Sequence, residues 1–131
     1  MPTGTAAVGV DVVDVGRFRS VLRRRTGLLQ RLFTPSEREH AGRFADPVPH
    51  LAARFAAKEA VMKALGVGIG GFGFSDVEVT RRPSGRPGLC LTGAASRVAG
   101  EMRAGSASLS MSHTGDVALA VVVMDLAPEH H

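Results

Sequence analysis

The sequence predicts an α+β fold in which helices pack against a mainly antiparallel sheet. The expected order of elements is strand, three helices, two strands, helix, two strands, and short turns join the last two strand pairs. Strands and helices that are grouped in this way, instead of alternating, favour an antiparallel sheet. The 131 residues contain no repeat and no long linker. We therefore expect one domain over residues 1–126 and a tail over residues 127–131, whose final histidines match the start of an expression tag.

The first strand is expected over residues 6–14, where β-branched residues dominate. Because successive side chains of a strand alternate between its faces, Asp11 lies on the opposite face from three valines, Val8, Val10 and Val12. A carboxylate within an apolar strand is costly unless it is paired or bound to a cation. Asp11 is therefore a stronger functional candidate than Asp14, which can cap the next helix.

Two helices are expected after this strand. The first covers residues 16–32, with an apolar stripe at helical spacing that is interrupted near residues 26–27. The second begins at residues 34–37, which read Thr-Pro-Ser-Glu and supply an N-cap, a proline at the first helical position and the glutamate of a capping box. Two prolines within residues 46–49 end it.

The third helix, from about residue 50 to residue 65, carries unusual charges and ends at Gly66. The chain has 14 arginines but only two lysines, Lys58 and Lys63, and both lie in this helix. Lysine differs from arginine in presenting a compact charge and in being able to lose its proton, which suggests chemistry here. A solvated face with a Glu59–Lys63 pair explains the pattern equally well. Lys58 lies on the apolar stripe, where its amine can snorkel to solvent.

The remaining elements are short. Strands over residues 76–80 and 88–91 flank a turn rich in proline and glycine, which indicates a hairpin. A helix of small residues follows to about residue 102, and strands over residues 107–114 and 117–124 complete the chain. The last strand is apolar on both faces. A buried central strand and a subunit interface are both consistent with that pattern.

The charge distribution suggests an acidic partner. The net charge is +4, and no acidic residue occurs between Asp14 and Glu37, whereas six arginines do: Arg17, Arg19, Arg23, Arg24, Arg25 and Arg31. Such a field attracts nucleic acid or an acidic protein, and a solubilising surface is the common alternative explanation of a run of charges. The absence of tryptophan and tyrosine disfavours a single-stranded nucleic acid, because base stacking needs aromatic surfaces. One cysteine, no membrane-length apolar run and no visible secretory signal predict a cytoplasmic location.

Separated segments of the chain match one known pattern, and the helix 54–66 is its most specific part. The segments are Gly9–Asp11, Arg17, Phe33–Glu37, Arg54–Gly70, Gly85–Pro87 and Ser110–Thr114. Together they resemble the holo-acyl-carrier-protein synthase type of 4′-phosphopantetheinyl transferase. The resemblance implies transfer of 4′-phosphopantetheine from coenzyme A to a serine of an apo acyl carrier protein, which leaves adenosine 3′,5′-bisphosphate.

The resemblance also implies roles for individual residues. Asp11 and Glu59 would bind a divalent cation, usually Mg²⁺, and Glu59 and Lys63 would be catalytic. The resemblance does not identify the general base for the carrier serine, and our first candidate is Glu59 acting through a metal-bound water. Contacts to coenzyme A would come from Arg54, Lys63, Gly66, Arg86, Pro87, His113 and Thr114. The carrier would dock on Arg17 and Arg24. The family commonly forms a homotrimer with its active sites between subunits.

Two other functions compete with this interpretation. A basic nucleic-acid-binding module would account for the arginines, but not for Asp11, Glu59 and the placement of the lysines. A metal-dependent phosphodiesterase acting on coenzyme A-like pyrophosphates would use the same carboxylates without a protein acceptor. Within the transferase interpretation, the carrier could belong to fatty-acid synthesis or to a polyketide pathway.

Overall fold

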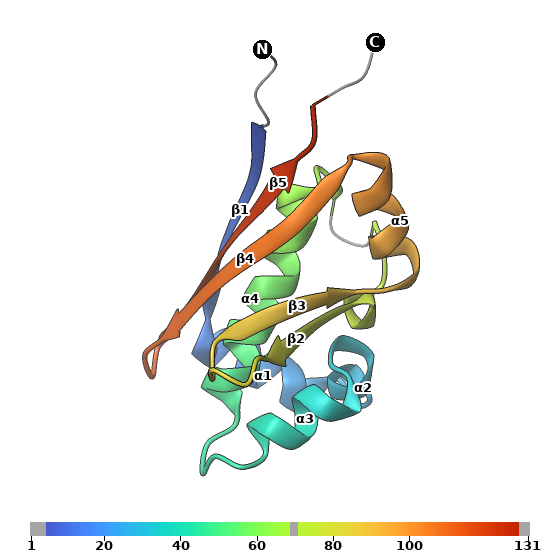
Figure 1. Ribbon diagram of the computed structural model, residues 1–131. Helices are drawn as coiled ribbons and strands as arrows, with labels where there is room; N and C mark the ends of the chain where they lie inside the picture. Colours follow the sequence, from blue (N-terminus) through green and yellow to red (C-terminus); the bar gives the residue numbers. More distant parts are fainter. Residues whose placement is uncertain (1–4, 69–70, 129–131) are drawn as a thin grey trace.

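The computed structural model describes residues 5–68 and 71–128. It has an α+β fold with the expected order of elements (Figure 1). The elements are β1 (Thr5–Asp14), α1 (Val15–Arg24), α2 (Leu28–Leu32), α3 (Pro35–Ala41), α4 (Val48–Ala64), the 3₁₀ turn η1 (Phe74–Asp76), β2 (Val77–Arg81), β3 (Pro87–Leu91), α5 (Gly93–Glu101), β4 (Ala104–His113) and β5 (Val117–Leu126). The strands are antiparallel, as predicted, and they form two sheets: the three-stranded sheet β1-β5-β4 and the two-stranded hairpin β2-β3.

One expectation about the helices was wrong. The helix predicted over residues 16–32 is two helices, because Arg25 is extended and Gly27 adopts a left-handed conformation with φ 82°. The caps were predicted correctly. The Asp14 carboxylate accepts a hydrogen bond from the backbone N of Arg17 at 2.7 Å, and Thr34 and Glu37 form a reciprocal capping box. These caps fix where α1 and α3 begin.

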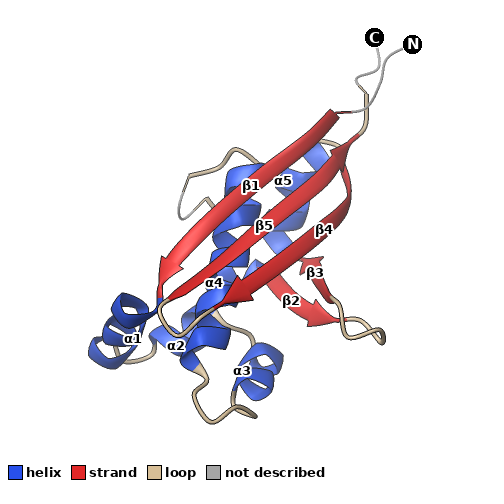
Figure 2. Ribbon diagram, turned by 90° about the vertical axis from the view of Figure 1, so that its left-hand side faces the viewer, coloured by secondary structure: helices blue, strands red, loops and turns tan. Residues whose placement is uncertain are grey.

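The central strand of the larger sheet is β5, and α4 crosses one face of that sheet (Figures 1 and 2). The contact between β1 and α4 depends on Gly9, because a Cβ built on it would lie 1.8 Å from the carbonyl oxygen of Ala60. Small residues also keep α4 close to the sheet: three alanines of α4 and two of β5 are fully buried, namely Ala56, Ala57, Ala60, Ala118 and Ala120. The close approach brings Asp11, two residues after Gly9 on the same face of β1, against α4.

The other face of this sheet is uncovered by helices in the described part of the chain (Figure 2). We call it the valine face, since it exposes side chains of Val8, Val10, Val12, Val117, Leu119 and Val123, each 37–63% accessible. On β4 the same face carries serines, because Ser108, Ser110 and Ser112 pair with odd-numbered residues of β5. β5 is thus the central strand of the sheet, with one face buried under α4 and the other face contributing to the exposed valine face.

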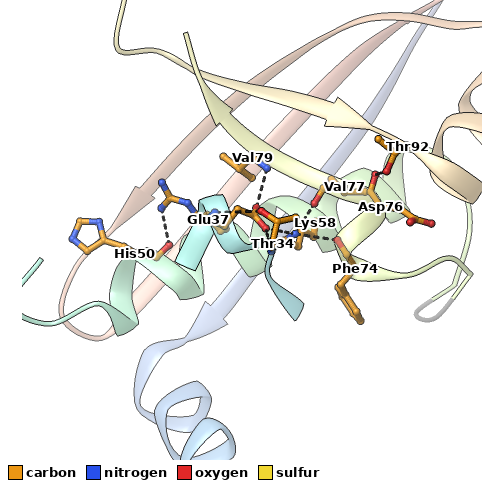
Figure 3. Close-up of polar contacts among 10 residues, drawn as sticks. Thr34, Glu37, His50, Lys58, Phe74, Asp76, Val77, Val79 and Thr92 are labelled. Carbon is orange, nitrogen blue, oxygen red and sulfur yellow. Dashed lines mark hydrogen bonds and ion pairs between the residues drawn. The ribbon is translucent and has the colours of Figure 1, made fainter. Parts of the chain in front are cut away.

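A buried ion pair connects four elements and corrects the expectation for Lys58. The amine does not reach solvent: Lys58 is fully buried, and its Nζ donates to Glu37 Oε1 at 2.7 Å, to Phe74 O at 3.0 Å and to Val77 O (Figure 3). The other Glu37 oxygen accepts from the backbone N of Val79 at 2.9 Å. This pair ties α4 to α3, η1 and β2. Burial lowers the pKa of Lys58, and the charge of Glu37 opposes that shift.

No helix among the described residues combines the length and the apolar character that a bilayer crossing requires.

Candidate active site

Asp11 and Lys63 meet where β1 passes the last turn of α4. Lys63 Nζ donates to Asp11 Oδ1 at 2.8 Å and to the carbonyl of Val10 at 3.0 Å. The side chain of Asp11 is 10% exposed and that of Lys63 is 53% exposed, so the carboxylate is fixed and the amine is reachable. The hydrogen bond to Asp11 raises the pKa of Lys63, which keeps the ammonium protonated at neutral pH.

Glu59 belongs to the same cluster, one helical turn before Lys63. Burial raises the pKa of Glu59, the charge of Asp11 raises it further, and the charge of Lys63 opposes both effects. The two carboxylates therefore repel each other and would gain from a shared cation. Within residues 5–68 and 71–128, no group of three or more His, Cys, Asp or Glu could enclose a metal. A pair of carboxylates that line a groove suits Mg²⁺, which keeps waters and takes substrate phosphate oxygens as further ligands.

These carboxylates line a groove of about 1100 Å³ formed by β1, α1, α2, α4 and η1, which we call the carboxylate groove. Three phenylalanines, Phe18, Phe55 and Phe74, give it an apolar wall, and three arginines, Arg17, Arg25 and Arg31, line it as well. Arg17 thus shares a groove with Asp11 and Glu59. Arg24 does not line the groove, and its Nε donates to the carbonyl of Ser20 at 3.4 Å.

Arg54 lies in a different place, a cavity of about 290 Å³ between α3, α4 and β2. It is 3% exposed, its Nη1 donates to the carbonyl of His50 at 3.2 Å, and its Nε has no hydrogen-bond partner in the described structure. Arg43 and Arg81 line the same cavity. Burial lowers the pKa of Arg54 and the charge of Arg81 lowers it further, whereas Glu37 opposes both. This arginine cavity has the charge and the free donor that an anionic group needs.

His113 lies at the end of β4, near the first turns of α4. Its ring is 4.6 Å from the ring of His50, which in turn stacks on Phe44 with a centroid separation of 3.5 Å. Burial lowers the pKa of His50, and the charge of His113 adds to that shift. Thr114 starts the turn that follows, where its Oγ1 accepts from the backbone N of Asp116 and of Val117, both at 3.1 Å. The Thr114 hydroxyl is therefore already an acceptor within the turn.

The other predicted coenzyme A contacts lie elsewhere. Gly66 follows the C-cap of α4 with φ 70° and donates its backbone N–H to the carbonyl of Lys63 at 3.1 Å. Arg86 closes the β2–β3 turn, where its carbonyl accepts from Arg82 N at 2.9 Å, and Pro87 begins β3 opposite Arg81. The glycine-rich segment that begins at Gly66 extends to residue 70, and residues 69 and 70 lie outside the described ones.

One chain therefore brings together Asp11, Glu59, Lys63 and Arg17, but places Arg54 in a separate cavity. The reason is helical geometry: Glu59 follows Arg54 by five residues, which turns its side chain about 140° around α4. Sequence reasoning missed the pairing of Glu37 with Lys58 and the contributions of Arg43, Arg81, Phe55 and Phe74. A lysine on an apolar stripe was the available signal for the pair. Arg43 lies in the irregular segment after α3, and Arg81 is the last residue of β2, so neither belonged to a periodic pattern.

Known proteins match this sequence and this fold. A family model described as the 4′-phosphopantetheinyl transferase superfamily matches residues 7–122. The chain is 49% identical to the holo-acyl-carrier-protein synthase of Desulforudis audaxviator over 117 residues, which cover 88% of this chain and 89% of that protein. It is 41% identical to the holo-acyl-carrier-protein synthase of Caldanaerobacter subterraneus subsp. tengcongensis over 116 residues, with coverages of 88% and 91%.

Solved structures agree with the sequence matches. The ACPS–CoA complex of Chronobacterium ammoniagenes superposes with a TM-score of 0.82 at 33% identity, covering 94% of this chain and 98% of that one. The holo-acyl-carrier-protein synthase of Helicobacter pylori in complex with coenzyme A superposes with a TM-score of 0.76 at 34% identity, covering 89% and 98%. Both confirm the resemblance found in the sequence, and the chain belongs to the 4′-phosphopantetheinyl transferase superfamily, among the holo-acyl-carrier-protein synthases.

Proposed function

We propose that this enzyme transfers 4′-phosphopantetheine from coenzyme A to a serine of an apo acyl carrier protein. The observation that carries the proposal is a pair of carboxylates, Asp11 and Glu59, in a groove lined by arginines and phenylalanines, with the Lys63 ammonium bonded to Asp11. Transfer of a phosphoryl-linked group needs charge stabilisation around a pyrophosphate more than it needs covalent catalysis by the protein. Two carboxylates for a cation and one ammonium supply that stabilisation.

Asp11 and Glu59 are the residues that would hold Mg²⁺. When bound, the ion would neutralise charge on the pyrophosphate of coenzyme A. The carrier serine oxygen attacks the phosphorus that bears pantetheine, and the bond from that phosphorus to the oxygen of the adenosine phosphate breaks. Lys63 Nζ stabilises or protonates this leaving oxygen, and Glu59 is our candidate to accept the serine proton.

We propose that the carrier protein binds at the carboxylate groove. Its arginines offer positive charge to an acidic partner, and its phenylalanines offer apolar contact near the carboxylates. Arg17 would contact the carrier within this groove, and Arg24 would add to the field from the exposed surface of α1. An assay that compares carriers from fatty-acid and polyketide synthesis would identify the pathway that the enzyme serves. We propose a cytoplasmic reaction in either case.

We further propose a homotrimer in which a neighbouring subunit completes each site. The valine face would then be covered by other copies, and Arg54 and His113 of one subunit would hold the phosphates and adenosine of a coenzyme A bound at the carboxylates of the next. Val10→Glu, in the middle of the valine face, should give a monomer in analytical ultracentrifugation and lose coenzyme A affinity. Ser96→Glu, on the exposed surface of α5, is the matched control and should remain trimeric.

The test of the activity is mass spectrometry of an apo carrier protein incubated with coenzyme A and Mg²⁺. We expect a carrier that gains phosphopantetheine, and we expect Asp11→Ala and Glu59→Ala to abolish that gain. Adenosine 3′,5′-bisphosphate released at the same rate without carrier would instead identify a phosphodiesterase. Retention on nucleic acid that weakens with salt, without coenzyme A binding, would identify a nucleic-acid-binding module.

A further inference from the structure

We propose that the Lys63 ammonium takes the place of the metal ion: it pairs with Asp11 while the metal is absent, and it moves away from Asp11 when the metal binds. The inference rests on the proposed function, because it takes Asp11 and Glu59 as the metal ligands. It adds an order of events: loading of the metal would free the Lys63 ammonium to reach the substrate pyrophosphate.

The geometry supports an ammonium that occupies the position of a metal. Lys63 Nζ is 2.8 Å from Asp11 Oδ1 and 3.0 Å from the carbonyl of Val10, so it uses oxygen atoms as a hard cation would. Asp11 is held by β1, is 10% exposed and cannot follow a departing partner far. The Lys63 side chain is 53% exposed, so it can move away from Asp11 without disrupting packing.

The local charge supports an exchange and argues against joint occupancy. Asp11 and Glu59 repel each other, and the Lys63 ammonium, which is bonded to Asp11, supplies a nearby positive charge when no metal is present. A divalent ion placed on the same Asp11 oxygen would lie within a few ångströms of the ammonium, and like charges at that distance repel. Binding of the ion therefore favours departure of the lysine.

The two lysines of the chain differ in how firmly they are held. Lys58 is fully buried and donates to three oxygen acceptors, so it is locked in place. Lys63 shares its helix but lies mostly in solvent with one carboxylate partner among the described residues. The chain contains no other lysine. Lysine labelled with ¹³C at Cε therefore gives two sets of NMR signals, and Lys58 serves as the internal control for Lys63.

The first experiment titrates the ¹³C-lysine protein with Mg²⁺ in the absence of coenzyme A. We expect the Lys63 signal to move toward the position that it has in metal-free Asp11→Asn, where the ion pair is missing, while the Lys58 signal stays fixed. Binding of the ion is followed on the same samples with Mn²⁺ as the probe, by the loss of the free-ion EPR signal. A Lys63 signal that stays in place while Mn²⁺ binds would overturn the inference and leave the metal site intact.

The second experiment measures the affinity for Mn²⁺ of Lys63→Met and of Arg97→Met, a control that removes one exposed positive charge from α5. Loss of the competing ammonium should tighten binding by about tenfold in Lys63→Met and leave Arg97→Met at the wild-type value. Equal or weaker binding to Lys63→Met would refute the exchange. Absence of Mn²⁺ binding to all three proteins, with or without coenzyme A, would refute the proposed metal site together with the inference.

Discussion

Replacement of Lys58 by methionine should destabilise the fold more than any other single change that preserves side-chain volume in α4. Methionine is unbranched and only one atom shorter than lysine, and it removes the charge. Glu37 would then be a buried carboxylate without its cation, and the carbonyls of Phe74 and Val77 would lose a donor. Both defects lie at a position with no exposed surface.

The magnitude follows from the burial of the pair. Removal of one partner from a buried ion pair costs about 3–5 kcal/mol, because the remaining charge is left uncompensated. Domains of this size have a free energy of unfolding of about 5–15 kcal/mol, so the loss is a large fraction of the total. It corresponds to a decrease in Tm of roughly 10–20 °C. The double variant Lys58→Met, Glu37→Gln removes both charges and keeps an acceptor for Val79 N, so we expect it to recover about 1–3 kcal/mol.

The assay is urea unfolding followed by circular dichroism for the wild type, both single variants and the double variant. Protein concentration must be the same throughout, because the stability of an oligomer depends on it. Similar m-values would show that the variants unfold from comparable native states. A loss below about 1 kcal/mol in Lys58→Met, or a double variant as unstable as the sum of the singles, would refute the role assigned to the pair.

Three further predictions concern other parts of the molecule. Gly9→Ala should lower Tm sharply or prevent folding, since its Cβ would lie 1.8 Å from a carbonyl oxygen of α4, whereas the control Gly16→Ala, with its nearest atom at 3.5 Å, should fold normally. The lowered pKa of His50 contributes stability that is present above pH about 6.5 and is lost as the pH falls through the folded pKa, so the decrease in Tm between pH 7.5 and 5.5 should be smaller in His50→Gln than in wild type. Arg17→Glu combined with Arg24→Glu should lower kcat/KM for the carrier mainly through association, in a salt-dependent way, while calorimetry shows unchanged coenzyme A binding; equal losses in both would exclude a docking role.

Local signals in the sequence predicted the element order and the caps because those features depend on neighbouring residues. The Asp14 cap and the Thr34–Glu37 capping box each involve residues within three positions of one another. The face of Asp11 was predictable from strand alternation alone. The prediction of one helix over residues 16–32 was wrong because an apolar stripe can continue across a short break, and Gly27 with its positive φ makes that break.

The environment of Lys58 could not be predicted from the same patterns. Periodicity places a lysine on an apolar stripe, but it does not say how deep the stripe is buried. In this fold α4 is surrounded by β1, β5, α3 and β2, so that two of its charged residues, Arg54 and Lys58, are buried. The partner, Glu37, lies 21 residues away and already had a sufficient explanation as a capping residue. When each residue of a long-range pair already has a local explanation, a single sequence gives no sign that the two residues interact.

The face of β1 that packs on α4 is the more polar one, and this arrangement links the fold to the proposed assembly. Gly9 and Asp11 face the helix, whereas Val8, Val10 and Val12 are 48–63% exposed. Exposure of apolar surface on this scale is unfavourable in an isolated chain, and contiguous patches of this kind are typical of interfaces. The carboxylates and the arginine cavity lie in separate hollows of one subunit. A trimer closed through the valine face would account for both observations, because it would cover the valines and supply a second subunit to each site. Val10→Glu should therefore lose trimer formation and coenzyme A affinity together, and a monomeric variant with wild-type coenzyme A affinity would show that one subunit binds the substrate unaided.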